Sequence, residues 1–544
     1  MKGAAAIAQI LKREGVKFIT GYPVNSVLEQ AAVADIRPII VRQERVGLHM
    51  ADAVSRVTSG KQIGVFAMQH GPGTENAFGG VAQAYGDSVP IIVIPGGYPR
   101  RLMNLPPNFN AALNFRHVAK WVENVVFADQ IPDAMRRAFS QARNGRPRPC
   151  VVEVPVDVMQ EETPEPLIYE PVQATRSAPD PKDVAKVAEV LMNAKRPLLY
   201  AGQGVHYAQA WPELKELAEL LALPVTTSLQ GKSAFPENHP LSLGSGGRSL
   251  SKQLHHFLQS ADVILGIGCS FATTNYGLTM PKGKVYIHAT QDPADLNKDL
   301  RAHHALVGDA QLTLQALLAE VKGRLKGKPR DAAPVAKEIQ EHKSQWLHEW
   351  MPRLTSAEVP LSPYRVIWDL LHTVDPAQTI ITHDAGSPRD QISPFWECTQ
   401  PLTYLGWGKT TQLGYGLGLA MGAKLAKPDK LCVNVWGDAA IGFTGMDFET
   451  CVRERIPILS VLLNNFSMAI ELKVMPVSTE KYRSTDISGN YSEMAKAFGG
   501  YGERVTQPAE IVPAIKRAVR KTQEGTPALL EFITQKEVDI SFYR

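Results

Sequence analysis

The chain has 544 residues, of which 44% are apolar and 21% are charged, and its formal net charge is +4 at pH 7. A chain of this length is too long for one hydrophobic core and predicts about three domains. The composition is that of a globular protein, and so small a net charge gives no electrostatic argument for binding nucleic acid or a membrane surface.

The N-terminal segment, MKGAAAIAQILKREGVKFITG, carries apolar residues at helical spacing, and Lys12 interrupts them too early for a secretory signal. No apolar run reaches the roughly eighteen residues that a membrane-spanning helix requires. The five cysteines are widely spaced without a CxxC pair, so the sequence predicts neither a zinc site nor a disulfide framework. We expect a cytoplasmic protein with no membrane or nucleic-acid partner.

Two polar stretches divide the chain into three blocks. The first, EETPEPLIYEPVQATRSAPDPKD from Glu161, contains five prolines and no helical or strand period, which predicts a linker. The second, VKGRLKGKPRDAAPVAKEIQEHKSQW from Val321, is basic and broken at Pro329, which predicts another surface connection. The predicted domains are residues 1–165, 183–325 and 360–544.

Each block alternates β-branched runs with helical patterns, which is typical of parallel sheets covered by helices. In the first block, IGVFAM, HGPGTENAFGGVAQAYGD and VPIIVIPGG predict a strand, a helix and a strand. RPLLYAGQG, ADVILGIG and KVYIHAT are strand-like in the second block, and TIITHDAG, KLCVNVWGD and ILSVLLNN in the third. The prediction is therefore an α/β protein with three doubly wound parallel-sheet domains.

Polar residues follow two apolar runs of the third block. Asp438 ends the first run and Asn465 the second, with a helical pattern between them. Because crossover connections join parallel strands, both ends open on one sheet edge, about 4.8 Å apart if the strands are neighbours. The two side-chain oxygens could then share one Mg²⁺ ion that also binds a phosphate, while Gly437 allows a close turn and the N–H groups of Ala439 and Ala440 face that phosphate. The alternative is ordinary strand-end turn residues.

The Gly-Asp pair, the twenty-seven residues from Asp438 to Asn465 and the sequence between them resemble the thiamine diphosphate motif of the pyruvate oxidase, acetolactate synthase and decarboxylase superfamily. VRQERVGLHMADAVSRVTSG is similar to that family's segment with a cofactor-activating glutamate, and HGPGTENAFGGVAQAYGDSVPIIVIPGG to its GPG helix and strand. GKSAFPENHPLSLG and GYGLGLAMGA are similar to its central and last-domain motifs. The resemblance implies a pyrimidine-binding domain, a central Rossmann-like domain and a diphosphate-binding domain.

Thiamine diphosphate and Mg²⁺ are the cofactors that the resemblance implies. Asp438 and Asn465 would bind Mg²⁺ through their side chains, and Ser467 through its backbone carbonyl. Glu44 would contact the pyrimidine ring nitrogen and share a proton with it, because burial favours the neutral carboxyl. Without the resemblance, Glu44 is interpreted as a surface acid between two arginines. The other residues implied to contact the cofactor are Gly386, Ser387, Thr411, Leu413, Gly437, Ala439, Ala440 and Met468.

Three further residues are candidates for catalysis. Glu471 stands where decarboxylases of the family carry an active-site glutamate and acetolactate synthases carry an apolar residue; as an alternative, it is a solvated acid near Lys473. Gln69 and His70 precede GPG, where related enzymes have a Thr-Ser pair or a catalytic histidine, so one of them is expected to line the site. A helix-capping role is the alternative for His70.

The expected function is cleavage or ligation of a carbon–carbon bond of a 2-oxo acid, by a decarboxylase or an acetolactate synthase-like carboligase. Gly97 departs from acetolactate synthases, which have glutamine there. A 2-hydroxyacyl-coenzyme A or diketone lyase and a non-catalytic cofactor-binding homologue are the alternatives. A small-molecule substrate and a homodimer or homotetramer are implied, because Glu44 would serve a cofactor held by another subunit. Residues 268–299 resemble a region that binds FAD or ADP in some members, but their sequence supports neither ligand.

Overall fold

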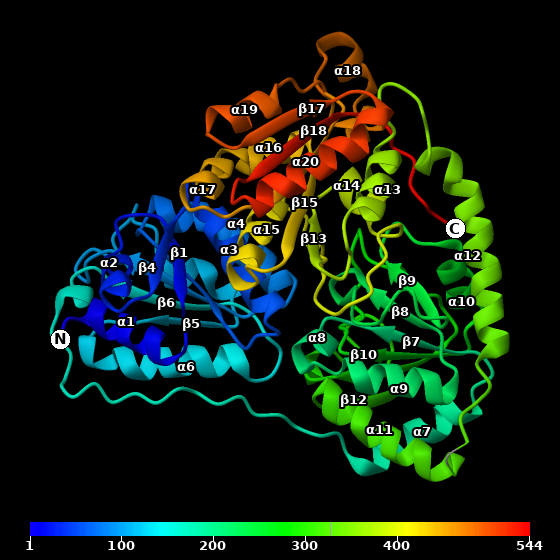
Figure 1. Ribbon diagram of the computed structural model, residues 1–544. Helices are drawn as coiled ribbons and strands as arrows, with labels where there is room; N and C mark the ends of the chain where they lie inside the picture. The colour runs from blue at the N-terminus through cyan, green and yellow to red at the C-terminus, as the bar shows by residue number, and fades with distance from the viewer. Residues whose placement is uncertain (327, 544) are drawn as a thin grey trace.

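The computed structural model describes residues 1–326 and 328–543. Three sheets of six strands each follow one another along the chain, and all of their strand pairs are parallel. Figure 1 shows the three units side by side, with helices packed against their sheets. The predicted fold class is therefore confirmed, and each sheet falls within one predicted domain, whose boundaries stay predictions.

The N-terminal sheet has the order β2-β1-β3-β4-β6-β5. Alternate residues of β3 enter different apolar clusters, Val65 and Ala67 on one face and Phe66 and Met68 on the other, so both faces are covered. Its strands are β1 Phe18–Gly21, β2 Arg37–Ile40, β3 Gly64–Met68, β4 Ile91–Gly97, β5 Trp121–Asn124 and β6 Cys150–Pro155. Its helices are α1 Gly3–Arg13, α2 Ser26–Val33, α3 Glu44–Val57, α4 Pro72–Gly86, α5 Ala111–Asn114 and α6 Ile131–Arg143.

The central sheet has the order β12-β11-β10-β7-β8-β9. Its strands are β7 Pro197–Ala201, β8 Val225–Ser228, β9 Ser242–Gly246, β10 Val263–Ile267, β11 Val285–Thr290 and β12 His304–Val307. Its helices are α7 Pro181–Asn193, α8 Gly204–Ala208, α9 Trp211–Leu221, α10 Lys252–Ser260 and α11 Ala310–Leu325.

The C-terminal sheet has the order β14-β13-β15-β16-β18-β17. Its strands are β13 Thr379–His383, β14 Tyr404–Leu405, β15 Leu431–Gly437, β16 Leu459–Asn464, β17 Tyr501–Val505 and β18 Ala528–Ile533. Its helices are α13 Pro363–Thr373, α14 Ser387–Ile392, α15 Tyr415–Ala426, α16 Asp438–Thr444, α17 Phe448–Arg453, α18 Pro476–Tyr482, α19 Tyr491–Ala497 and α20 Ile511–Gln523.

Of the two predicted connections, the structure has the first as an extended linker and the second largely as helix. Residues 161–180 form no helix or strand, as predicted, and run along the base of the molecule to α7 (Figure 1). The stretch from Val321 is not simply a surface connection, because α11 continues to Leu325 and most of the rest belongs to the long helix α12, Ala333–Leu354. Ile339, Trp346 and Trp350 form a buried stripe on α12, and the polar residues between them masked that stripe in the sequence.

Helices α3 and α15 pack together and join the N-terminal and C-terminal domains. Their buried side chains belong to one apolar cluster. A Cβ atom on Gly422 would lie 2.1 Å from the Met50 carbonyl oxygen, and one on Gly418 would lie 2.5 Å from the His49 Cβ. Glycine is therefore needed at both positions, because any side chain would push the helices apart.

Within residues 1–326 and 328–543, no helix combines the length and apolarity needed to cross a bilayer. All five cysteines are buried free thiols, in agreement with the absence of a predicted disulfide framework.

Candidate functional site

Strands β15 and β16 are neighbours, with Gly437 paired to Leu463, so Asp438 and Asn465 lie just beyond adjacent strand ends. The Asp438 carboxylate and the Asn465 amide oxygen both accept a hydrogen bond from the backbone N–H of Ser467, at 3.0 and 2.9 Å. The two oxygens therefore converge at one sheet edge.

The turn after β16 directs Ser467 toward this edge. Phe466 has a φ of 55°, and the chain then pairs with Asp486 in an antiparallel bridge at Ser467. The Ser467 hydroxyl is buried without a hydrogen-bond partner, and among the described residues no donor reaches the Ser467 carbonyl. Unused oxygens beside a carboxylate and an amide oxygen form a donor set that suits Mg²⁺, so the residues present fit the implied metal.

Burial raises the pKa of Asp438, although backbone N–H groups of Ser467 and Ala439 oppose that shift. The Ala439 N–H donates to Asp438 Oδ1 at 3.0 Å and is therefore engaged locally, while Ala440 is buried in α16. Whether Ala439 and Ala440 face a phosphate stays a prediction.

The ends of β13 and β15 form one side of this site. Gly386, with a φ of 82°, immediately precedes α14, which begins at Ser387. A Cβ on Gly386 would lie 3.6 Å from Ile470 Cδ1, and one on Gly437 would lie 3.8 Å from Pro388 Cγ. Gly386, Ser387 and Gly437 thus lie together at the edge that carries Asp438, with open backbone suited to a diphosphate.

Asp384 is a residue that the sequence analysis missed. Its carboxylate accepts hydrogen bonds from the N–H groups of Ala385, Gly414 and Gly416, at 2.8, 2.9 and 3.0 Å. It therefore fixes the segment that contains Thr411 and Leu413 at the end of β13. Burial raises the pKa of Asp384 to about 7, against the opposing effect of those N–H donors. An acid directly after the β-branched run TIIT and His383 was the available clue.

Glu44 is the first residue of α3 and is buried, so its interpretation as a surface acid is wrong. Burial raises the pKa of its carboxyl, and a hydrogen bond with Asn76 acts in the opposite direction. A Cβ on Gly73 would lie 3.4 Å from Glu44 Oε1 and 3.2 Å from Gln69 Cβ. Glycine at position 73 therefore leaves space where Glu44 and Gln69 approach each other.

His70 lies at the entrance to α4 but does not cap it, because the N-cap is Gly71 and no side chain makes a capping bond. The rings of His70 and Tyr98 pack edge-on, with their centroids 4.5 Å apart. The Nδ1 atom of His70 is buried without a hydrogen-bond partner. Burial lowers the pKa of His70. Gly97 has a local reason to be glycine, since a Cβ there would lie 3.1 Å from the backbone of Pro155.

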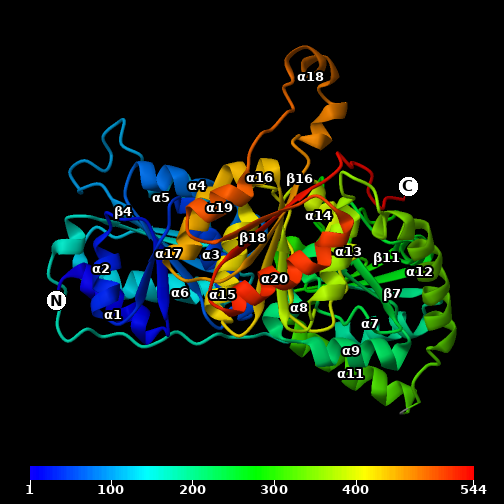
Figure 2. The same cartoon turned by 45° about the horizontal axis from the view of Figure 1, so that its top comes forward.

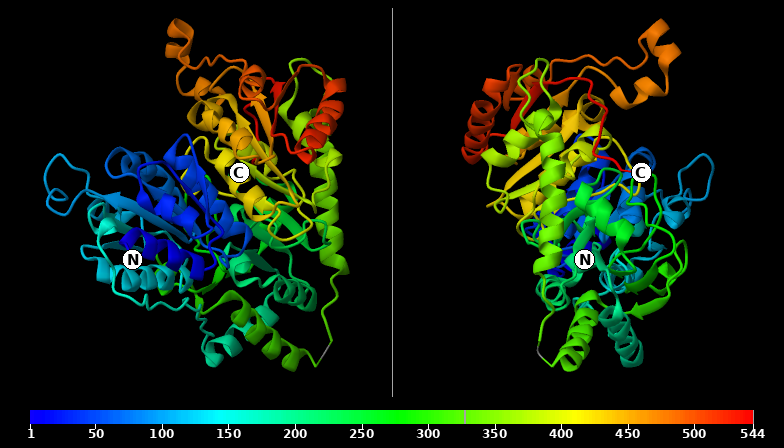
Figure 3. Two further views of the ribbon diagram at one scale, coloured as in Figure 1. Left: turned by 60° about the vertical axis from the view of Figure 1, so that its left-hand side comes forward. Right: turned by 90° about the vertical axis from the view of Figure 1, so that its right-hand side faces the viewer.

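Glu471 is exposed in a 3₁₀ turn, Ala469–Lys473, whereas Met468 before it is half-buried. The turn leads into a projecting segment around α18 (Figures 2 and 3). The Glu471 N–H donates to the Met468 carbonyl at 3.1 Å, and the catalytic role of the Glu471 carboxylate stays a prediction. Among the described residues no hydrogen bond joins Glu44 to Asp438, Asn465 or Ser467. The exposed large apolar residues of the projecting segment are Val474, Met475, Val477 and Tyr482.

A separate cavity of about 890 Å³ lies between the N-terminal and central domains. The region predicted to resemble a nucleotide site contributes much of its lining, including residues 268–274 and 290–292. Lys409, close in sequence to Thr411, also lines it and donates to the Ser270 hydroxyl at 3.3 Å. Burial lowers the pKa of Lys409 to about 8. The sequence of this region supports neither FAD nor ADP as the ligand of the cavity.

Three family models match the chain, and all describe thiamine pyrophosphate (thiamine diphosphate) enzymes. The N-terminal binding domain matches residues 1–122, the central domain residues 184–317 and the C-terminal binding domain residues 384–532.

Relatives match over nearly the whole length. A probable acetolactate synthase large subunit of Methanocaldococcus jannaschii is 30% identical, over 98% of this chain and 92% of the relative. The acetolactate synthase isozyme 3 large subunit of Escherichia coli is 28% identical, over 96% of this chain and 93% of the relative. The crystal structure of benzoylformate decarboxylase from Polynucleobacter necessarius covers 99% of both chains with a TM-score of 0.83 and 21% identity, which supports the fold. The chain belongs to the thiamine pyrophosphate-dependent enzyme family.

Proposed function

We propose that the protein uses thiamine diphosphate and Mg²⁺ to cleave or join the carbon–carbon bond next to the carbonyl of a 2-oxo acid. The observation that carries the proposal is the convergence of the Asp438 and Asn465 oxygens on the Ser467 N–H. The acetolactate synthase names of full-length relatives support a 2-oxo acid as the substrate class.

Asp438, Asn465 and the Ser467 carbonyl would hold Mg²⁺, and the open backbone at Gly386 and Ser387 would receive the diphosphate. Thiamine diphosphate would supply a nucleophilic carbon for the substrate carbonyl and a positively charged thiazolium ring as the electron sink. Leu413 and the Thr411 carbonyl would position the heterocycle, and Asp384 fixes their segment through the N–H groups of Gly414 and Gly416.

Glu44 would hold the proton that is exchanged with the pyrimidine nitrogen. Burial raises its pKa, which favours the protonated carboxyl relative to that of an exposed glutamate. Because residue 73 is glycine, no side chain of that residue contacts Glu44 Oε1. An exposed glutamate would have an ordinary pKa, so burial is what suits Glu44 to this proton exchange.

His70 or Gln69 is the side chain that we propose meets the substrate from the N-terminal domain. The buried Nδ1 of His70 lacks a partner, and its lowered pKa keeps the ring neutral near pH 7. A neutral imidazole can donate to a substrate oxygen or accept a proton from it. Glu471 is proposed as a second proton-transfer group, because its N–H bond to the Met468 carbonyl keeps it beside a residue expected to contact the cofactor.

A homodimer, or a tetramer of two dimers, is the assembly that we propose. The Glu44 half of the site and the Asp438 half lie on different domains without a hydrogen bond between them in the described chain. The exposed apolar residues around α18, such as Val477 at 62% and Tyr482 at 78% exposure, are suited to burial against a second copy. Light scattering of the purified protein measures this directly, and a monomer would contradict it.

The function is tested by incubating the protein, thiamine diphosphate and Mg²⁺ with pyruvate, longer and aromatic 2-oxo acids, an acyl thioester and a diketone. We expect release of carbon dioxide or a ligation product from a 2-oxo acid, and a loss of about 10²- to 10⁴-fold in kcat for Glu44→Gln. Glu75→Gln, at an exposed acid of α4, is the matched control. An unchanged rate for Glu44→Gln would contradict the proton assignment, and turnover of the thioester or diketone alone would replace the substrate class.

A further inference from the structure

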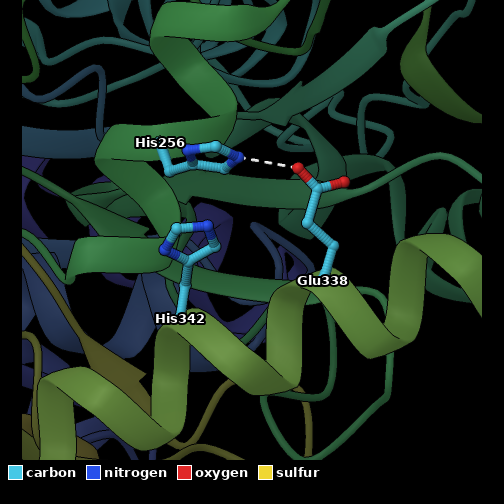
Figure 4. Close-up of side chains that lie close together, drawn as sticks. All are labelled: His256, Glu338 and His342. Atoms are coloured by element: carbon cyan, nitrogen blue, oxygen red, sulfur yellow. Dashed lines mark hydrogen bonds and ion pairs between the residues drawn. The ribbon is translucent and has the colours of Figure 1, made fainter.

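A cluster of two histidines and a glutamate lies outside the thiamine site, on the outer side of the central domain. His256 comes from α10, and Glu338 and His342 come from α12. One potential ligand atom from each residue lies within 4.8 Å of the other two. Figure 4 shows the two rings one above the other, with the glutamate carboxylate beside them.

The arrangement is built into the packing of the two helices. Glu338 and His342 are four residues apart and therefore share one face of α12. Between them in sequence, Ile339 is buried in the same apolar cluster as Leu254 and Phe257 of α10, which sets the register of the helices. The cluster thus stands at the edge of a packed contact, where its geometry is constrained from both sides.

The hydrogen bonds within the cluster leave one buried nitrogen without a partner. His256 Nε2 and Glu338 Oε1 are 2.7 Å apart, and the two imidazole rings stack with centroids at 3.9 Å and an angle of 24°. The Nδ1 of His342 is buried without a hydrogen-bond partner. The side chains of His256 and Glu338 are 35% and 31% exposed, so an ion could reach the cluster from solvent.

We propose that His256, Glu338 and His342 bind one divalent transition-metal ion, Zn²⁺ in particular, that fastens α12 to α10. Two imidazoles and one carboxylate are ligands that Zn²⁺ prefers, whereas Mg²⁺ prefers oxygen. In a tetrahedral site with bonds of about 2.1 Å, ligand atoms lie about 3.4 Å apart. The stacked rings must therefore rotate out of their near-parallel arrangement to turn one nitrogen each toward the same ion. Water would take the fourth position.

Arg196 is the competing partner of Glu338. Its Nη2 lies 2.8 Å from Oε1, and its Nη1 lies 3.5 Å from Oε2. Oε1 is also the oxygen that meets His256, so an ion bound to Oε1 would displace both the His256–Glu338 hydrogen bond and the 2.8 Å contact of Arg196. Arg196 would keep Oε2, as an outer contact that orients the ligand.

The consequence lies in the position of α12. This helix runs along one side of the molecule and packs on α10 of the central domain and on α13 of the C-terminal domain (Figure 1). An ion at its first turns would hold it to the central domain, and an ion that binds the folded chain raises its stability by mass action.

The test uses the protein saturated with thiamine diphosphate and Mg²⁺, so that the magnesium site is occupied, after removal of transition metals with a chelator. We expect one Co²⁺ per chain with a visible absorption spectrum of nitrogen and oxygen ligation, its displacement by Zn²⁺, and a rise in melting temperature with Zn²⁺. His342→Ala should lower the affinity more than about 100-fold, because even outer contacts of metal ligands cost 10- to 100-fold.

His348→Ala is the matched control, since His348 is an exposed histidine on the same helix. It should keep both the cobalt spectrum and the melting shift. Glu338→Gln, which preserves shape, is the second variant and should also weaken binding. Absence of Co²⁺ binding to the wild type, or equal binding by the His342→Ala and His348→Ala variants, would overturn the proposal.

Discussion

The Asp438 carboxylate and the Asn465 amide oxygen share one donor, the Ser467 N–H, although twenty-seven residues separate them in the chain. The parallel pairing of β15 and β16 brings their strand ends together. The turn after Asn465 then places a backbone N–H between the two oxygens. The metal-binding arrangement proposed for this enzyme is thus largely preformed by the fold.

Removing either oxygen is therefore expected to weaken Mg²⁺-dependent binding of thiamine diphosphate. Asp438→Ala and Asn465→Ala should each raise the dissociation constant of the cofactor by more than about tenfold at fixed Mg²⁺, because the ion bridges protein and diphosphate. Calorimetric titration measures this. Asp429→Ala, at an exposed acid before β15 and thus at its opposite end, should bind normally. Equal affinities for all three variants would contradict the assignment.

Asp384 should make the stability of the protein depend on pH. Its pKa is about 7 in the folded chain, against about 3.9 for an unperturbed aspartate. Between these values the folded state holds a proton that the unfolded state has lost, so this contribution to the free energy of unfolding is complete below the lower value. It declines as pH rises and is lost above about 7.

Asp384→Asn cannot ionise and should lack this slope. We expect the difference in melting temperature between the wild type and the variant to change with pH between about pH 4 and 7, and to stay constant above that range. Wild-type stability should fall relative to the variant as pH rises. Melting curves at a series of pH values measure the difference, and parallel curves throughout would show that Asp384 does not titrate in this range.

Much of the fold was predictable because its strands are buried on both faces. In β15, Cys432 and Trp436 enter one apolar cluster while Val433 and Val435 enter another, so the run is apolar apart from Asn434 and is visible in sequence. Helix α12 was not predicted, since its buried residues are sparse among polar ones and Pro352 lies within it. A narrow apolar stripe on a charged helix resembles a solvated linker.

The candidate site was predictable where its residues follow strands along one crossover. Asp438 and Asn465 belong to a single βαβ unit, so topology brings them together. Asp384 was missed because its partners, Gly414 and Gly416, are backbone groups about thirty residues away. The burial of Glu44 depends on α4, whose Asn76 and Gly73 lie beside it, and local spacing does not encode that environment.

Close packing of α3 and α15 predicts opposite effects of the same substitution at two helical glycines. Gly422→Ala should lower stability by about 1–3 kcal/mol or more, because the new Cβ would meet the Met50 carbonyl oxygen at 2.1 Å. Gly323→Ala, in α11 with open space around its Cβ position, should instead raise stability by up to about 1 kcal/mol. Thermal melts compare the two variants, and a neutral Gly422→Ala would mean that the helices separate easily.

The cavity between the N-terminal and central domains is large enough for an adenine nucleotide, since ligand pockets typically measure about 300–1,000 Å³. Lys409 is its candidate phosphate contact, because its amine lies beside Ser270 in the predicted nucleotide region. We expect ADP or FAD to raise the melting temperature. The affinity should fall as pH rises through about 8, where Lys409 loses its charge.

Lys409→Met should reduce nucleotide affinity by about 10- to 150-fold, the range that corresponds to losing one charged hydrogen bond worth 1.5–3 kcal/mol. Lys282→Met, another lysine of the same cavity, is the control and should change affinity less, because it does not contact Ser270. Fluorescence of a released flavin and mass spectrometry of the denatured protein identify whatever co-purifies. If neither nucleotide shifts the melting temperature, or if Lys409→Met binds as tightly as the wild type, the cavity is not a nucleotide site. The role of Lys409 would then be limited to positioning the segment that leads to Thr411. The backbone N–H of Lys409 already donates to Asp87 Oδ1 at 3.3 Å.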